Sequence, residues 1–176
     1  TSPEVVSATT TNATKELGEP AHAGNNGGKS VWWWFQPPAD GVLTLSTTNS
    51  TFDTLLSLYL GNQVSALTPI AGNDDAYDGS PGGFSLLTVA VRSNQVYRIA
   101  VDGFDGLSGS VSLHYAFTPS AVFRLTVGGM EGGTVLPGSA DFVGNATVVL
   151  TATPVAYYTF SSWIGDVVSS VNPLSV

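Results

Sequence analysis

The chain has 176 residues, of which 43% are hydrophobic and only 10% are charged. That apolar fraction is enough for a packed core and argues against a wholly disordered chain. Five Lys and Arg residues stand against 13 Asp and Glu residues, which gives a formal net charge of −8. Nucleic acids and anionic membranes both require clustered cations, so this balance argues against both as partners. Cysteine is absent, which excludes disulfides, thiolate metal sites and cysteine nucleophiles.

The remaining composition indicates where the protein works. Little lysine together with much Ser, Thr and Gly is typical of secreted and cell-surface bacterial β-proteins. No stretch is long and apolar enough to cross a bilayer, so we expect no membrane insertion. We therefore expect an extracellular or cell-surface location.

Short apolar and β-branched runs alternate with Gly, Asn, Asp and Pro along most of the chain. A spacing of about 8–12 residues between such turn signals is typical of a β-sandwich or barrel, so we predict an all-β fold. The apolar run at residues 96–102 predicts a central strand. We expect strands at residues 29–36, 41–47, 55–59, 85–91, 96–102, 109–115, 123–128, 133–136, 146–154 and 158–164.

The segment Phe117-Thr-Pro-Ser120 separates two stretches of different composition. We interpret residues 118–121 as a linker between a first domain at residues 15–117 and a second at residues 122–176. The second is close to the lower size limit for a self-sufficient core. Residues 1–14 form a β-prone, nearly uncharged N-terminal extended segment.

The first domain contains a series of motifs in a known order. They are Gly18-Glu-Pro-Ala-His-Ala-Gly24, Gly28-Lys-Ser-Val-Trp-Trp-Trp34, Pro38-Ala-Asp-Gly41, Phe52-Asp-Thr-Leu-Leu-Ser-Leu-Tyr59, Asn73-Asp-Asp75 and Tyr97-Arg-Ile-Ala-Val-Asp-Gly103. Together, over about residues 8–117, they resemble the bacterial pre-peptidase C-terminal domain. The resemblance implies a jelly-roll-like antiparallel β-sandwich attached to secreted peptidases or large surface proteins.

The second domain has a different signature. It runs through Leu125-Thr-Val127, Gly133-Thr-Val-Leu-Pro137, Val149-Leu-Thr-Ala-Thr-Pro154, Phe160-Ser-Ser-Trp-Ile-Gly-Asp166 and Asn172-Pro-Leu174. Over about residues 120–176 it resembles a divergent bacterial repeat related to the internalin B-type repeat. The resemblance implies a small β-grasp-like domain. Because that unit usually continues with one or two more strands, we expect an incomplete domain or an edge supplied from elsewhere.

An acidic group of side chains is the candidate metal site. Ca²⁺ takes six to eight oxygen ligands and tolerates irregular loops, and converging carboxylates repel unless a metal or protons offset them. Some relatives in the pre-peptidase family bind calcium, so the resemblance implies calcium as the one cofactor. The alternative is that these residues only cap turns through their own backbone. The candidate ligands are Asp53, Asn73, Asp74, Asp75 and Asp78.

The aromatic run Trp32-Trp-Trp-Phe35 supplies the two candidate binding residues, Trp32 and Trp34. Strand alternation sends Trp32 and Trp34 to one face and Trp33 and Phe35 to the other. One pair is expected in the core, and the other is either covered by the neighbouring loop or exposed, where it would stack on sugar rings. In that loop, Glu19 and His22 are either ligands, a hydrogen-bonded latch or a simple contact that fixes the loop.

The chain lacks the nucleophile elbow, the zinc-protease motif, the P-loop and the dinucleotide fingerprint, so we expect no enzymatic activity. We expect a non-catalytic extracellular structural or interaction module of a bacterial secreted or cell-surface protein, acting as a spacer or in docking or adhesion. Two alternatives stay open. One is a filament subunit whose residues 1–14 add as a strand to the next copy. The other is a carbohydrate-binding accessory module. The expected partners are other domains of a larger surface protein, copies of itself, or polysaccharide.

Overall fold

The computed structural model describes residues 4–77, 83–128 and 131–176, and these residues form 13 strands. All paired strands are antiparallel. The predicted all-β fold class is therefore confirmed. The chain divides into two compact units between Ser120 and Ala121. No helix among the described residues is long and apolar enough to cross a membrane.

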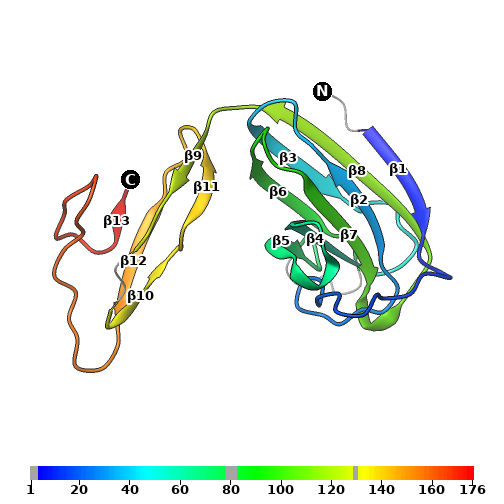
Figure 1. The fold of residues 1–176 in the computed structure, drawn as a ribbon, viewed down its shortest axis with the longest axis horizontal. Helices are drawn as coiled ribbons and strands as arrows, with labels where there is room; N and C mark the ends of the chain where they lie inside the picture. The colour runs from blue at the N-terminus through cyan, green and yellow to red at the C-terminus, as the bar shows by residue number, and fades with distance from the viewer. Residues whose placement is uncertain (1–3, 78–82, 129–130) are drawn as a thin grey trace. The chain divides into compact units, whose positions relative to one another are not determined.

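Two four-stranded sheets form the first unit (Figure 1). Except for the β4–β5 hairpin, every connection passes from one sheet to the other, as in a double-sheet jelly roll. One sheet has the order β1-β8-β3-β6, made of β1 (Glu4–Thr9), β8 (Ser110–Pro119), β3 (Gly41–Ser46) and β6 (Leu86–Val91). The other has the order β2-β7-β4-β5, made of β2 (Val31–Phe35), β7 (Tyr97–Gly103), β4 (Thr54–Leu60) and β5 (Thr68–Asn73).

The core of this unit lies between the two sheets. In β3, buried Leu43 and Leu45 alternate with less buried residues, because successive side chains of a strand point to opposite faces. Facing residues of the other sheet, such as Leu58 and Ile99, belong to the same apolar cluster. Fully burying one such side chain contributes about 1.5–3 kcal/mol. The prediction of a central strand at residues 96–102 is confirmed, since β7 lies between β2 and β4.

Apart from β1, which lies in the β-prone N-terminal segment, four segments differ from the expected strands: β5, β11 (Ala140–Val143) and β13 (Leu174–Ser175) were not predicted, and residues 158–164 were predicted but form no strand. β5 was not predicted because Thr68-Pro-Ile-Ala-Gly-Asn73 contains Pro and Gly, which are disfavoured inside strands. It forms because it is an edge strand whose pairing with β4 shifts register between Leu58 and Tyr59. The strand predicted at residues 158–164 is wrong. Despite its aromatic residues, that segment makes only an isolated bridge between Trp163 and Ser169.

The two ends of the first unit are paired together. The N-terminal extended segment contains β1, which pairs along β8 of the same chain from Glu4 opposite Tyr115 to Thr9 opposite Ser110. Donation of this segment to another subunit therefore requires β1 to leave its own β8. The predicted linker at residues 118–121 is shorter than expected, because β8 continues to Pro119, opposite Gly41.

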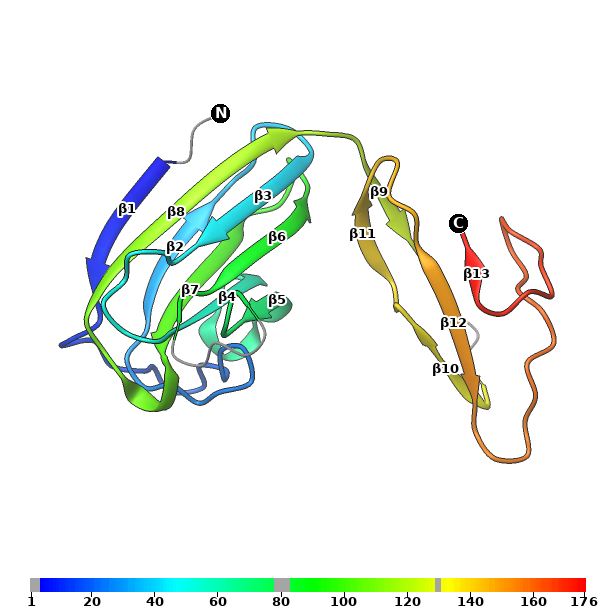
Figure 2. The ribbon, with the colours of Figure 1, turned by 180° about the vertical axis from the view of Figure 1, so that it is seen from behind.

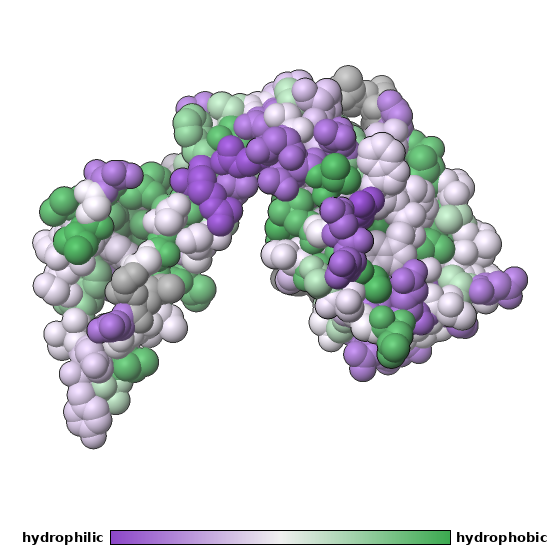
Figure 3. Space-filling view, in the orientation of Figure 1, coloured by the Kyte–Doolittle hydropathy of each residue, from purple (hydrophilic) through white to green (hydrophobic). Residues whose placement is uncertain are grey.

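In the second unit, the regular secondary structure of the described residues consists of strands, which are joined by turns and irregular segments (Figure 2). Its described residues bury three apolar side chains well: Val122, Val148 and Leu150. This small core agrees with the small size of the unit. The space-filling view shows apolar side chains on the surface of both units (Figure 3). β9 (Val122–Leu125) pairs with β11 (Ala140–Val143), and β12 (Val149–Pro154) pairs with β10 (Gly133–Leu136) and β13 (Leu174–Ser175).

Candidate functional site

Three of the predicted metal ligands converge at one end of the second sheet. Asp53 directly precedes β4, while Asp74 and Asp75 directly follow β5. Because β4 and β5 are antiparallel neighbours, the start of one lies beside the end of the other. One carboxylate oxygen from each residue lies within 4.8 Å of those from the other two. We call these three residues the Asp triad.

Burial makes the Asp triad electrostatically unfavourable. The Oδ1 atoms of Asp53 and Asp74 are buried and have no hydrogen-bond partner among the described residues. Burial raises the pKa of Asp53, and the negative charges of Asp74 and Asp75 raise it further. Burial likewise raises the pKa of Asp74, with added repulsion from Asp75 and Asp105. Buried oxygens that lack donors carry a desolvation cost that a bound cation would offset.

The cations of the chain are engaged away from the Asp triad. Lys29 Nζ donates to Ser108 Oγ at 3.1 Å, and Arg98 Nη2 donates to Asn62 Oδ1 at 3.1 Å. Lys15 donates to the carbonyl of Asn26. The remaining two form ion pairs at 3.6 Å, Arg92 with Asp40 and Arg124 with Asp141. None of these contacts of Lys and Arg side chains involves a carboxylate of the Asp triad.

The other predicted ligands behave differently. Asn73 uses its amide to organise the loop, since Oδ1 accepts from Leu86 N at 2.8 Å and Nδ2 donates to Asp75 O at 3.0 Å. Asp78 lies outside the described residues. Asp102, which was not among the predicted ligands, is fully buried, and its carboxylate accepts hydrogen bonds from the backbone of Gly28 and Lys29. For Asn73 and Asp102, the geometry is therefore that of turn fixation.

His22 joins the loop before β2 to the outer face of the second sheet. Its side chain is fully buried, with Nε2 2.8 Å from Glu19 Oε1 and Nδ1 2.8 Å from the Tyr59 hydroxyl. Burial lowers the pKa of His22, and the neighbouring Glu19 only partly opposes this effect. Burial alone would raise the pKa of Glu19, but hydrogen bonds from Ser30, the Glu16 backbone and His22 outweigh it. This arrangement is the hydrogen-bonded latch, which was one of the alternatives for Glu19 and His22. Its third member, Tyr59, could not be recognised as a partner from the sequence.

The aromatic run is divided between the two faces of β2. Trp33 and Phe35 pack against the core cluster between the sheets. Trp32 points outward, where its ring lies 5.4 Å from that of His22 and 5.8 Å from that of Tyr59. Trp34 also points outward but is 65% exposed. The loop therefore shelters one of the two predicted binding residues and leaves the other open to solvent.

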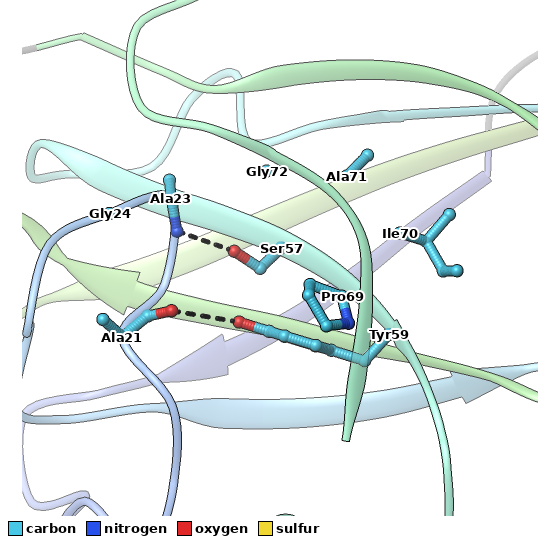
Figure 4. A pocket seen from close by; sticks show the side chains of 9 residues that line it. All are labelled: Ala21, Ala23, Gly24, Ser57, Tyr59, Pro69, Ile70, Ala71 and Gly72. Atoms are coloured by element: carbon cyan, nitrogen blue, oxygen red, sulfur yellow. Dashed lines mark hydrogen bonds between the residues drawn. The ribbon is translucent and has the colours of Figure 1, made fainter. Parts of the chain in front are cut away.

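A shallow pocket of about 230 Å³ lies between this loop and β4 and β5 (Figure 4). Two hydrogen bonds fix its wall: Ala23 N donates to Ser57 Oγ at 2.9 Å, and the Tyr59 hydroxyl donates to Ala21 O at 3.3 Å. Among the described residues, its lining carries no carboxylate or imidazole and therefore no pair of an acid and a base. The lining residues are Ala21, Ala23, Gly24, Ser57, Tyr59, Pro69, Ile70, Ala71 and Gly72.

Comparison with known families finds a match in the second unit. Residues 123–175 match the family model described as the divergent InlB B-repeat domain. The resemblance predicted from the motifs of residues 120–176 is thereby confirmed. The comparisons give no support for a pre-peptidase C-terminal domain, so for the first unit that resemblance stands on its motifs alone. No curated protein and no solved structure matches the chain significantly.

Proposed function

We propose that this chain is a non-catalytic structural and interaction module of a secreted or surface-attached bacterial protein. The observation that carries the proposal is the match of residues 123–175 to a repeat domain. The jelly-roll sandwich of the first unit supports it, since its interior is filled by a continuous apolar cluster. Function would then reside in surfaces, sheet edges and loops.

Localisation in the source cells tests this proposal. Antibodies raised against the purified chain are expected to label intact cells or to detect the protein in the culture medium. A cytoplasmic protein serves as the lysis control. Signal that is confined to the cytoplasmic fraction would overturn the proposal.

Calcium binding by the Asp triad is a second candidate function. It is supported by three converging carboxylates, two buried oxygens without donors, and the engagement of the cations elsewhere. Aspartate oxygens are suitable ligands for Ca²⁺, and extracellular calcium modules commonly bind with dissociation constants of about 0.1–1 mM. A bound ion would tie the start of β4 to the loop after β5.

Calorimetric titration of the full chain with CaCl₂ tests the calcium proposal. We expect one site that is lost in the Asp53→Asn/Asp74→Asn double variant and kept in the Asp166→Asn control, which removes an exposed carboxylate of the second unit. At 10 mM Ca²⁺ such a site would stabilise the native state by about 1.4–2.7 kcal/mol, which raises Tm by several degrees. A wild-type Tm that is identical in Ca²⁺ and in chelator would refute a native-state site.

Self-assembly by strand exchange is supported by the position of β1. It is an edge strand with β8 as its single described neighbour, and only Val6 and Ala8 of its residues pack against the core cluster. Edge strands with unpaired backbone groups are prone to intermolecular pairing. Exchange of β1 between copies, repeated head to tail, would give a filament.

A disulfide trap distinguishes exchanged from intramolecular pairing. Ser7 and Ser112 are cross-strand partners, and the natural chain contains no cysteine. Oxidation of a Ser7→Cys/Ser112→Cys variant is expected to give a covalent ladder on a non-reducing gel when strands are exchanged. A monomeric band alone at high protein concentration would rule out the filament. The Ser7→Cys single variant controls for nonspecific crosslinking.

A further inference from the structure

Trp34 is the most exposed tryptophan of the chain and occupies an ordered sheet face. The other three tryptophans are partly buried, whereas Trp34 is 65% exposed at the penultimate position of β2, where it pairs with β7. Its two neighbours in sequence are sheltered, Trp33 by the core cluster and Trp32 by the ring of His22. Trp34 therefore presents its indole on a rigid strand without contributing to the core described above.

Arg98 lies beside this indole in a fixed geometry. In the register of the sheet, Arg98 is directly opposite Trp34 on one side and Tyr59 on the other. Directly opposed residues have Cβ atoms about 4.5–5.5 Å apart, so the two side chains share one surface. The guanidinium is held by Nε donating to Gly61 O at 3.3 Å and Nη2 donating to Asn62 Oδ1 at 3.1 Å.

Amide side chains complete the polar rim. Asn62 is exposed, and its carbonyl oxygen accepts the hydrogen bond from Arg98, so that bond does not use its NH₂ group. Gln36 is exposed two residues after Trp34 in the chain. A guanidinium and two amides provide donors and acceptors beside an apolar ring, and Trp and Arg are the residues most enriched at binding hot spots.

We propose that Trp34, Arg98, Asn62 and Gln36 form a binding site for neutral polysaccharide. The apolar face of a sugar ring would stack on the indole, while adjacent hydroxyls would bond to the guanidinium and amides. The net charge of −8 favours neutral over acidic glycans, because it repels polyanions at long range. This proposal deepens the proposed function, on which it rests, by giving the module a partner.

Affinity electrophoresis of the full chain through gels containing soluble polysaccharides tests the site. The panel contains a β-1,3-glucan, a mixed-linkage β-glucan, a mannan and a dextran, with polygalacturonate as the acidic polymer. We expect retardation by at least one neutral polymer. Trp34→Ala is expected to weaken that binding at least tenfold, and Trp34→Tyr to preserve part of it.

Phe123→Ala is the matched control, because Phe123 is also a strand aromatic and is 64% exposed in the second unit. It should bind like the natural chain, and equal thermal melts for all variants would show that folding is intact. The proposal fails if no neutral polymer binds, if only polygalacturonate binds, or if Trp34→Ala binds normally. Such a failure would not change the result of the surface-labelling experiment. The polysaccharide site can therefore be rejected while the proposed extracellular role stands.

Discussion

The carboxylates of Asp53 and Asp74 and the imidazole of His22 have opposite effects on how stability changes with pH. Their pKa values are raised above the ordinary value of 3.8, so the native state binds these protons more tightly than the unfolded chain does. Through these two groups, the free energy of unfolding therefore increases as the pH falls through the raised pKa values toward 3.8, and decreases as the pH rises. His22 has a pKa below 6.5 in the native state, so acidification below 6.5 destabilises through it. Glu19 adds a loss below 4.5.

An Asp53→Asn/Asp74→Asn variant isolates the carboxylate contribution. In chelator at pH 7 we expect its Tm to exceed that of the natural chain, because the repulsion between ionised carboxylates is gone. The difference should shrink as the pH is lowered through the raised pKa values toward 3.8, because the natural carboxylates then take up protons. Thermal melts over this pH range check the prediction, with Asp166→Asn as the control, because Asp166 is an exposed carboxylate of the second unit. A difference that does not change with pH would contradict it.

Gly27 is required by the buried Asp102 carboxylate. It has φ of +53°, and a Cβ added there would lie 2.0 Å from Asp102 Oδ2. We expect Gly27→Ala to displace a carboxylate that binds three backbone N–H groups, those of Gly28, Lys29 and Gly103. The cost should be at least about 2 kcal/mol, since buried charged groups are expensive to leave unpaired.

Gly24→Ala is the control for Gly27→Ala. Gly24 also has a positive φ, of +85°, but a Cβ there meets nothing within 4 Å. We expect it to cost only about 1 kcal/mol, from backbone conformation alone. Urea unfolding curves compare the two variants. Equal losses of stability would show that contact with Asp102 contributes nothing.

The edge strand β1 is held to the sandwich through one of its two faces. Val6 and Ala8 pack against the core cluster, whereas Val5 is 50% exposed. We expect Val6→Asp to detach β1, because it places a charge against apolar side chains, and Val5→Asp to be tolerated. Hydrogen exchange of the amides of residues 4–9 checks this. Equal protection of these amides from exchange in both variants would contradict the assignment of Val6 to the buried face of β1 and Val5 to the exposed face.

The sequence pattern predicted some strands correctly and missed others. Regular alternation in β3 and the apolar run of β7 identified these strands, since burial of one or both faces leaves a direct pattern. β5 escaped prediction because an edge position tolerates Pro69 and Gly72, which propensities disfavour. Residues 158–164 have the composition of a strand but lack a described strand as partner, and a strand requires one.

The two units of the molecule have separate cores, and we expect them to unfold independently. Leu58 belongs to the apolar cluster of the first unit, and Leu150 is buried in the second. Leu→Ala substitutions in a core cost about 2–5 kcal/mol. In calorimetry, Leu58→Ala should lower only the transition of the first unit, and Leu150→Ala only that of the second. A single transition lowered by both variants would refute independence.

Alternation and turn residues in the chain were sufficient to predict an all-β fold, the opposite faces of Trp33 and Trp34, and oxygen-rich loops. These features are local, because side-chain direction in a strand depends only on position along it. Strand pairing decided the rest: which aromatic pair entered the core, and that Asp53 joined Asp74 and Asp75. It also directed Asn73 and Asp102 to backbone groups and gave Trp34 its neighbour Arg98. Such contacts join residues distant in the chain, and spacing in sequence carries no record of which strands become neighbours.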